Sequence, residues 1–211
     1  MELWEEYGGF YDTVNTSPPY RAMLHEVYRE LRVKDGDTVL DAGCGTGNLC
    51  KLLVSGGTAR VVGIDFSPTM LKTAADKLKG SGVKLLQMNL DARLALEDQS
   101  FDQVAAVHSL YAVKDPGPVL GEFYRVLRPG GRLVVVNPSP WARPPGGGLF
   151  GGSRVARMNS INSVIFQKGM TKEFHFLSPQ RLLELLTAAG FKQVRMKPTY
   201  GGNSILATAV R

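Results

Sequence analysis

The chain has few cysteines, few histidines and no long apolar run. Its 211 residues include two cysteines and three histidines. Cys44 and Cys50 have no histidine or further cysteine at ligand spacing nearby, so neither a metal site nor a secreted disulfide framework is expected. No apolar run approaches the roughly 20 residues that a membrane-spanning helix needs. The acidic start at residues 1–6 also lacks the apolar segment of a signal peptide, so a cytoplasmic protein is predicted.

Acidic residues are scarce in the second part of the chain. Residues 1–121 carry 12 basic and 16 acidic side chains, whereas residues 122–211 carry 13 basic and only 3 acidic ones. Such a basic excess can face nucleic acid, a membrane, an anionic substrate or only water. No base-reading or stacking motif accompanies it, so no sequence-specific nucleic-acid partner is expected. The length suits one ample core and is too short for two ordinary domains.

Seven short apolar or β-branched runs predict the strands of one α/β sheet. The first five alternate with helical patterns, which predicts βαβ units and parallel strands. The last two runs are joined by only six residues, too few for a parallel crossover, so the last strand is predicted antiparallel and the sheet mixed. Helices are expected on both faces of the sheet. The predicted strands are 38–42, 60–65, 83–88, 103–108, 132–137, 191–197 and 204–210.

Helix signals divide the predicted single domain into four parts. Ser67 and Ser178 are each followed by proline, the pattern of an N-cap before the first helical turn. An amphipathic stripe over residues 20–31 predicts a further helix before the sheet. The long stretch after the fifth strand is typical of a functional lid or a mobile segment. The four parts are an N-terminal helical cap (1–35), a core (36–137), a lid insertion (138–177) and a C-terminal helix with a hairpin (178–211).

The turn 43–47, after the first predicted strand, contains three glycines. Glycine permits a positive φ and lets a ligand approach the backbone, and the helix that follows offers unpaired N–H groups. Asp65 ends the second predicted strand, where a carboxylate can accept both ribose hydroxyls. A dinucleotide fingerprint would need glycine where Asn48 stands, and Asp41 would repel a pyrophosphate. The pattern therefore favours a cationic sulfonium nucleoside over a dinucleotide.

Four segments carry a resemblance to a known family: 39–47 (VLDAGCGTG), 62–71 (VGIDFSPTML), 100–102 (SFD) and 125–131 (RVLRPGG). With them, the chain resembles the class I S-adenosylmethionine-dependent methyltransferases of the UbiE/methyltransferase-11 type over roughly residues 36–137. The resemblance implies a Rossmann-like seven-stranded sheet and makes 36–137 the cofactor-binding core. It also implies S-adenosyl-L-methionine as the cofactor and S-adenosyl-L-homocysteine as the product.

Carried over by position, the resemblance assigns the cofactor contacts. It gives Asp65 the ribose hydroxyls. Two alternatives remain for the adenine amino group. Counting from the third strand favours Asn89 with the backbone of Leu90, whereas counting back from 101–102 favours Asp91 with Ala92. The first is preferred, because loops accept insertions more easily than strands. The resemblance also places Asp41, Gly43, Cys44 and Gly45 around the methionine part, Phe66 and Met70 against the adenine, and His108 and Ser109 toward the methyl group.

Methyl transfer from a sulfonium is an in-line displacement, so the protein mainly aligns donor and acceptor and excludes water. Such alignment is worth roughly 7 to 11 kcal/mol. A hydroxyl or carbon acid also needs a general base, for which His108, Tyr111, Tyr11 and His175 are candidates. His108 is preferred because it follows a parallel strand at the end where ligands bind. A hydrogen-bonded loop histidine is an equally weighted interpretation.

The predicted acceptor is a small molecule, anionic or lipid-like. An RNA or protein methyltransferase, and a cofactor-binding protein without transferase activity, are the alternatives. Arg143, Arg154 and Arg157 accompany Trp141 and Phe150 in the lid insertion, a combination that suits an anionic substrate or a weak peripheral membrane contact. A solvated loop is the simpler interpretation of the same residues. The sequence does not indicate an oligomeric state.

Overall fold

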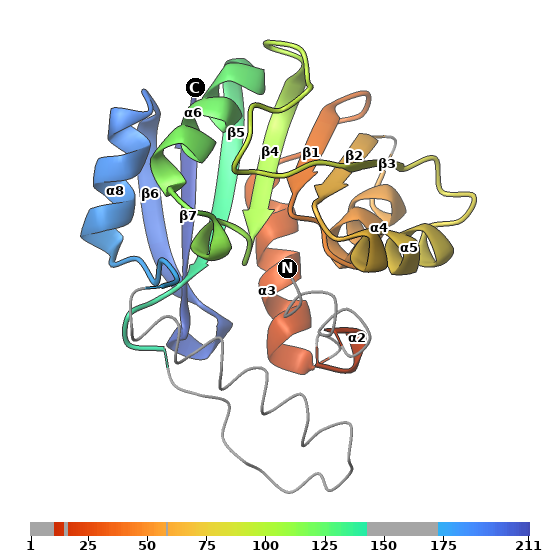
Figure 1. The fold of residues 1–211 in the computed structure, drawn as a ribbon, viewed down its shortest axis with the longest axis horizontal. Helices are drawn as coiled ribbons and strands as arrows, with labels where there is room; N and C mark the ends of the chain where they lie inside the picture. Colours follow the sequence, from red (N-terminus) through yellow and green to blue (C-terminus); the bar gives the residue numbers. More distant parts are fainter. Residues whose placement is uncertain (1–10, 15–16, 58, 143–172) are drawn as a thin grey trace, which may run out of the picture.

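The computed structural model describes residues 11–14, 17–57, 59–142 and 173–211. Within them a seven-stranded sheet has the order β3-β2-β1-β4-β5-β7-β6 (Figure 1). The strands β1 to β5 are parallel, and β7 is antiparallel to both of its neighbours, which confirms the predicted mixed sheet. The strands are β1 (Thr38–Ala42), β2 (Arg60–Asp65), β3 (Lys84–Gln87), β4 (Phe101–Val107), β5 (Leu127–Pro138), β6 (Lys192–Thr199) and β7 (Ser204–Val210).

Two of the helices begin at the predicted serine caps. The Ser67 hydroxyl accepts the Met70 N–H, and the Ser178 hydroxyl accepts the Arg181 N–H, both at 3.2 Å. Each hydroxyl thereby satisfies one of the N–H groups that a helix start leaves unpaired. The helices are α2 (Tyr11–Val14), α3 (Pro18–Leu31), α4 (Asn48–Ser55), α5 (Pro68–Lys77), α6 (Pro116–Val126) and α8 (Pro179–Ala188), with short 3-10 helices η1 (Leu110–Ala112) and η2 (Tyr200–Gly202).

Both faces of the sheet are covered by helices, and each has its own buried core. Successive side chains of a strand point to opposite faces. In β4, Val104 and Ala106 therefore pack in the core under α6 and α8, whereas Ala105 and Val107 pack in the core under α3 and α4. Parallel strands buried on both faces explain the nearly continuous apolar runs of the sequence. The layered arrangement agrees with the predicted helices on both faces (Figure 1).

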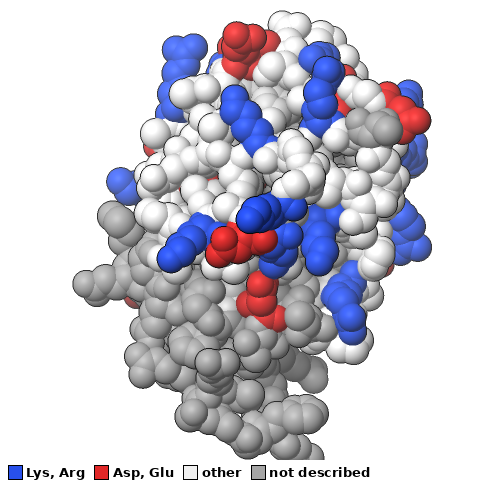
Figure 2. Space-filling view, turned by 90° about the vertical axis from the view of Figure 1, so that its right-hand side faces the viewer, with Lys and Arg blue, Asp and Glu red and all other residues white. Residues whose placement is uncertain are grey.

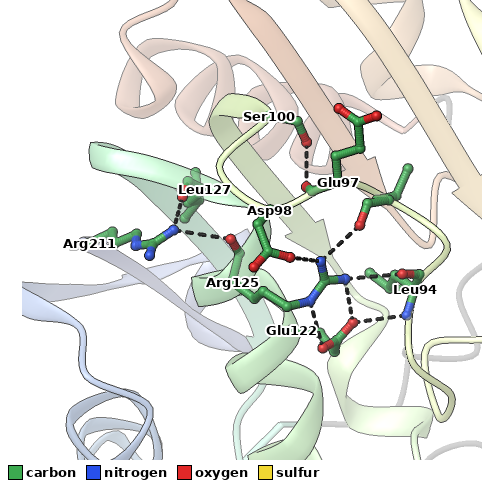
Figure 3. Close-up of polar contacts among 9 residues, drawn as sticks. Leu94, Glu97, Asp98, Ser100, Glu122, Arg125, Leu127 and Arg211 are labelled. Atoms are coloured by element: carbon green, nitrogen blue, oxygen red, sulfur yellow. Dashed lines mark hydrogen bonds and ion pairs between the residues drawn. The ribbon is translucent and has the colours of Figure 1, made fainter.

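Two of the segments that resemble the methyltransferase family, 100–102 and 125–131, brace the amino ends of β4 and β5, where the Arg128 guanidinium donates to the Asp102 carboxylate at 2.5 Å. Arg125 donates to both carboxylate oxygens of Glu122 at 2.9 and 2.8 Å and to Asp98 at 2.6 Å (Figure 3). It also donates to the carbonyls of Leu94 and Leu96, so one side chain ties the loop before β4 to α6. Ligands bind at the other, carboxyl, end of a parallel sheet. These segments therefore support the scaffold.

Some predicted boundaries differ from the structure. The sequence predicts a fifth strand from 132, but β5 begins at Leu127, because the glycine turn 129–131 continues the chain into the sheet. There the Gly130 N–H donates to the Arg211 carbonyl, and the Arg211 N–H donates to the Gly131 carbonyl. Residues 143–172 lie outside the described residues. They make up most of the predicted lid insertion and include its three arginines. Within the described ranges, no helix is long and apolar enough to cross a membrane.

Basic side chains predominate on the side of the molecule formed by β3, α4 and α5 (Figure 2). This side belongs to the part of the chain in which acidic residues outnumber basic ones. Two of those acids, Asp41 and Asp65, are buried, whereas Lys72, Lys79 and Lys84 are exposed. The charge of a sequence segment is therefore not the charge of the face that it forms.

Candidate cofactor-binding site

A cavity of about 390 Å³ lies at the carboxyl ends of β1 to β4. This size falls within the range of roughly 300 to 1,000 Å³ that small-ligand sites occupy. Most of the predicted cofactor residues line it. The lining consists of Tyr11, Gly43, Gly45, Asp65, Phe66, Met70, Met88, Asn89, Leu90, Asp91, His108, Ser109, Ala112, Val113 and Lys114.

Gly43 begins the turn that forms one wall of the cavity. Its φ is +77°, and a Cβ at this position would lie 2.3 Å from the Ser109 Cβ. Ser109 cannot readily move away, because its hydroxyl donates to the Ala42 carbonyl at 2.7 Å. The Gly43 and Cys44 N–H groups both donate to the Ile64 carbonyl, at 2.8 and 2.9 Å. Glycine is therefore required at 43 both by conformation and by close packing against the end of β4.

Asp65 joins this turn to β2. One carboxylate oxygen accepts the Gly45 N–H at 2.8 Å and the other accepts the Ser67 N–H at 3.0 Å. The side chain is buried, yet it belongs to the cavity wall. A carboxylate offers about four lone-pair positions. These contacts therefore orient the carboxylate at the cavity wall, where the family resemblance expects it to accept the ribose hydroxyls.

Asp41 and Cys44, predicted to surround the methionine part of the cofactor, are not among the residues that line the cavity. The Cys50 thiol donates to the Asp41 carboxylate at 3.2 Å. Burial raises the Asp41 pKa to about 7, and the negative charge of Asp65 acts in the same direction. Gly63 makes room for the two thiols, since a Cβ there would lie 3.0 Å from the Cys44 Sγ and 3.1 Å from the Cys50 Sγ. A contact between Asp41 or Cys44 and the cofactor remains a prediction.

Both alternatives for the adenine contact lie in the cavity wall. Asn89, Leu90 and Asp91 all line it. The Asn89 side-chain oxygen accepts the Asp91 N–H at 2.9 Å, and the Asp91 carboxylate accepts the Lys114 N–H at 2.7 Å. The geometry does not separate the two alternatives. Sequence reasoning missed Lys114, although the loop after a parallel strand is a place where such a residue is expected.

His108 lies where β4 ends, with a positive φ of 49°. Its Nε2 is 2.9 Å from the Ser204 hydroxyl, and its ring meets the Tyr200 ring edge to face at 5.7 Å. Burial lowers the His108 pKa to about 4, so the ring is neutral at physiological pH. Sequence reasoning missed Ser204 and Tyr200, because they reach His108 from β7 and η2.

The other predicted catalytic residues have different surroundings. Tyr11 lines the cavity, with its hydroxyl 3.5 Å from the Tyr20 hydroxyl. Tyr111 is buried against the rings of Phe174 and Phe176 and does not line the cavity. His175 has its Nε2 3.1 Å from the Lys114 carbonyl. In the part of the chain that the structure describes, no cluster of three or more His, Cys, Asp or Glu residues is arranged to hold a metal.

The fold and the cavity are those of a Rossmann-like α/β protein with a small-ligand site, and comparisons with known proteins place it among methyltransferases. A family model described as "Methyltransferase domain" matches residues 40–135. The demethylmenaquinone methyltransferase of Listeria monocytogenes serotype 4b (strain CLIP80459) is 31% identical over 221 residues, which cover 96% of this chain and 91% of that protein. The demethylmenaquinone methyltransferase of Geobacillus stearothermophilus is 32% identical over 220 residues, which cover 94% of this chain and 91% of that protein. The chain belongs to the class I S-adenosylmethionine-dependent methyltransferases of the UbiE/methyltransferase-11 type.

Solved structures show the same fold at lower identity. A methyltransferase from Aquifex aeolicus superposes with a TM-score of 0.67 at 22% identity, over 89% of this chain and 88% of that one. A chain from the complex of a Haloferax volcanii methyltransferase with its Trm112 activator has a TM-score of 0.76 at 20% identity. The match covers 98% of this chain and 96% of that one. The [4+2]-cyclase SpnF has a TM-score of 0.72 at 19% identity, and the match covers 90% of this chain and 80% of that one. The fold alone therefore does not determine the reaction.

The residues present fit S-adenosyl-L-methionine. The Gly43 turn offers a close backbone approach, Asp65 offers a carboxylate for the ribose, and Phe66 and Met70 offer an apolar wall for a base. The protein is a transferase that takes its methyl group from this cofactor.

Proposed function

We propose that the protein methylates a small aromatic acceptor of the hydroquinone class that carries an apolar tail. The observation that carries this proposal is the similarity, over nearly the whole chain, to proteins named demethylmenaquinone methyltransferase. A likeness in fold to the cyclase does not compete with it, because it rests on 19% identity. No observation of similar weight favours RNA or protein as the acceptor.

The cavity supports this chemistry through position and charge. When bound, S-adenosyl-L-methionine supplies a methyl group on a cationic sulfur. A neutral His108 does not repel that charge, and its imidazole can accept a hydrogen bond from a phenolic hydroxyl. Tyr11 and His108 both line the cavity, so they can orient the acceptor. With a pKa of about 4, His108 is a weak base, and we assign it orientation of the hydroxyl.

The direct test uses a demethylated naphthoquinol with one isoprene unit, kept reduced during the assay. Incubation with S-adenosyl-L-methionine should yield the methylated naphthoquinol and an equal amount of S-adenosyl-L-homocysteine, both measured by mass spectrometry. The oxidised quinone serves as the control, because it lacks the electron-rich ring that attacks the methyl group. Tight cofactor binding with no methylated naphthoquinol would contradict the proposed acceptor.

A tailed acceptor would be presented at a membrane surface, so we further propose a weak peripheral contact by a cytoplasmic protein. Trp141, just before residues 143–172, is 58% exposed, which suits an interfacial side chain. Sedimentation with anionic liposomes should carry part of the protein down at low salt, and less at high salt. A Trp141→Ala variant should sediment less. Equal sedimentation with and without liposomes would contradict the contact.

A further inference from the structure

Asp12 lies at the centre of a polar cluster that joins α2 to the glycine turn, to the start of α4 and to α5. Its carboxylate accepts the Thr46 hydroxyl at 2.6 Å and the Asn48 amide at 3.2 Å. The Lys77 ammonium lies 2.9 Å from each of its two oxygens. The cluster therefore links α2 to the glycine turn, through Thr46, and to α5, through Lys77.

The partners of Asp12 also form hydrogen bonds with one another. The Lys77 ammonium also donates to the Thr46 hydroxyl at 3.1 Å and to the Asn48 side-chain oxygen at 2.6 Å. Thr46 is fully buried, and the Lys77 side chain is only 17% exposed. Burial raises the Asp12 pKa, but hydrogen bonds from Thr46 and Lys77 outweigh this effect, so the pKa is below its ordinary value. Asp12 is consequently charged at physiological pH and holds its partners through charge-assisted hydrogen bonds.

Tyr11 precedes Asp12 in α2 and lines the cavity. Its ring rests on the glycine turn, since a Cβ on Gly45 would lie 3.7 Å from the nearest ring atom. Figure 1 shows α2 beside the amino end of α3, at the carboxyl ends of the central strands. The helix has only four residues, too few to be stable without tertiary contacts. The Asp12 contacts therefore hold α2, and with it the backbone of Tyr11, against the glycine turn and α5.

We propose that Asp12 is a positioning residue that holds Tyr11 over the cofactor cavity. The carboxylate does not line the cavity and acts on cofactor binding through the neighbouring ring. The inference rests on the cofactor of the family and not on the proposed acceptor. It can therefore be tested with S-adenosyl-L-homocysteine alone, so its failure is distinguishable from a failure of the proposed function.

The test is a double-variant cycle measured by isothermal titration with S-adenosyl-L-homocysteine. Asp12→Ala and Tyr11→Ala should each weaken binding about tenfold, which corresponds to about 1.4 kcal/mol. If Asp12 acts through Tyr11, the double variant should bind within about twofold of Tyr11→Ala. Additive losses, close to a hundredfold in the double variant, would overturn the proposal, as would unchanged binding by Asp12→Ala.

Two further variants separate positioning from general destabilisation. Lys77→Met keeps the apolar stem and removes the charge. In the wild-type background it should weaken binding of S-adenosyl-L-homocysteine, as Asp12→Ala does. In the Tyr11→Ala background it should have no further effect. It serves in place of Asp12→Ala if that variant does not fold. Glu184→Gln breaks a salt bridge of similar length, 3.1 Å to Arg181, on the distant α8 and should leave binding unchanged. A loss of binding by Glu184→Gln equal to that of Asp12→Ala would contradict a local role for Asp12.

Discussion

Replacement of Gly43 by alanine should destabilise the protein and weaken cofactor binding together. The new Cβ would lie 2.3 Å from the Ser109 Cβ, whereas carbon atoms in contact are roughly 3.5 to 4.0 Å apart. Gly80 is the matched control, because its φ is also +77° and a Cβ there would meet nothing within 4 Å. The two variants share the conformational strain and differ in the overlap.

The magnitude follows from these two contributions. A left-handed conformation costs a residue other than glycine roughly 1 to 2 kcal/mol, and we expect this loss for Gly80→Ala. Overpacking adds roughly 1 to 3 kcal/mol at position 43, because Ser109 is held by its hydrogen bond to the Ala42 carbonyl. Gly43→Ala should therefore lose about 3 kcal/mol of unfolding free energy. For a chain of this length the melting temperature should fall by about 6 to 12 °C.

The assay is urea unfolding of both variants, paired with titration of S-adenosyl-L-homocysteine. Gly43→Ala should bind the nucleoside more weakly, whereas Gly80→Ala should bind it as the wild type does. Replacing Ser109 by glycine in the Gly43→Ala background removes the atom that overlaps and should recover part of the stability. Equal losses of stability at the two glycines would refute the close-packing argument.

Three other outcomes follow from the same contacts. Asp65→Ala should weaken S-adenosyl-L-homocysteine binding by about thirtyfold or more in titration, because it removes a charged acceptor that also orients the turn; unchanged affinity would exclude Asp65 as a ribose ligand. Arg125→Ala should lower the free energy of unfolding in urea by about 3 kcal/mol, because Glu122 loses its partner. The folded variant should keep its affinity for S-adenosyl-L-homocysteine. A loss of affinity without a loss of stability would contradict the scaffold role of Arg125. Asp41 has a pKa of about 7 in the folded protein, so its protonated form stabilises the cofactor-free fold. This contribution to the free energy of unfolding is complete below about pH 4 and is lost as the pH rises through about 7. Affinity for the cationic cofactor should change in the opposite direction, and Asp41→Asn should flatten both pH profiles.

Local signals and connection lengths were sufficient to predict most of the fold. The Ser67 and Ser178 caps started helices where expected. The connection before β7, predicted as six residues and observed as 200–203, correctly predicted an antiparallel strand. The glycine turn and Asp65 came together because the carboxyl ends of parallel strands meet at one edge of the sheet. These features depend on residues close in sequence or on a general rule of topology.

Contacts between distant segments could not be predicted in the same way. Ser204 is 96 residues from His108, and Lys77 is 65 residues from Asp12. Each pairing depends on how side chains pack after the sheet has formed, and no local pattern specifies it. The low pKa of His108 has the same origin, because burial, and not the neighbouring sequence, lowers it. The basic face over β3 and α5 also depends on which acids the fold buries (Figure 2).

The most direct test of methyl transfer to a small molecule uses cofactor labelled in its methyl group. The wild-type protein and Asp65→Ala are each incubated with this cofactor and with metabolite, RNA and protein fractions of a cell extract. The predicted result is label in the metabolite fraction with the wild type, and little or none with the variant. Label in RNA or protein alone, or no label in any fraction despite tight cofactor binding, would contradict a small-molecule methyltransferase.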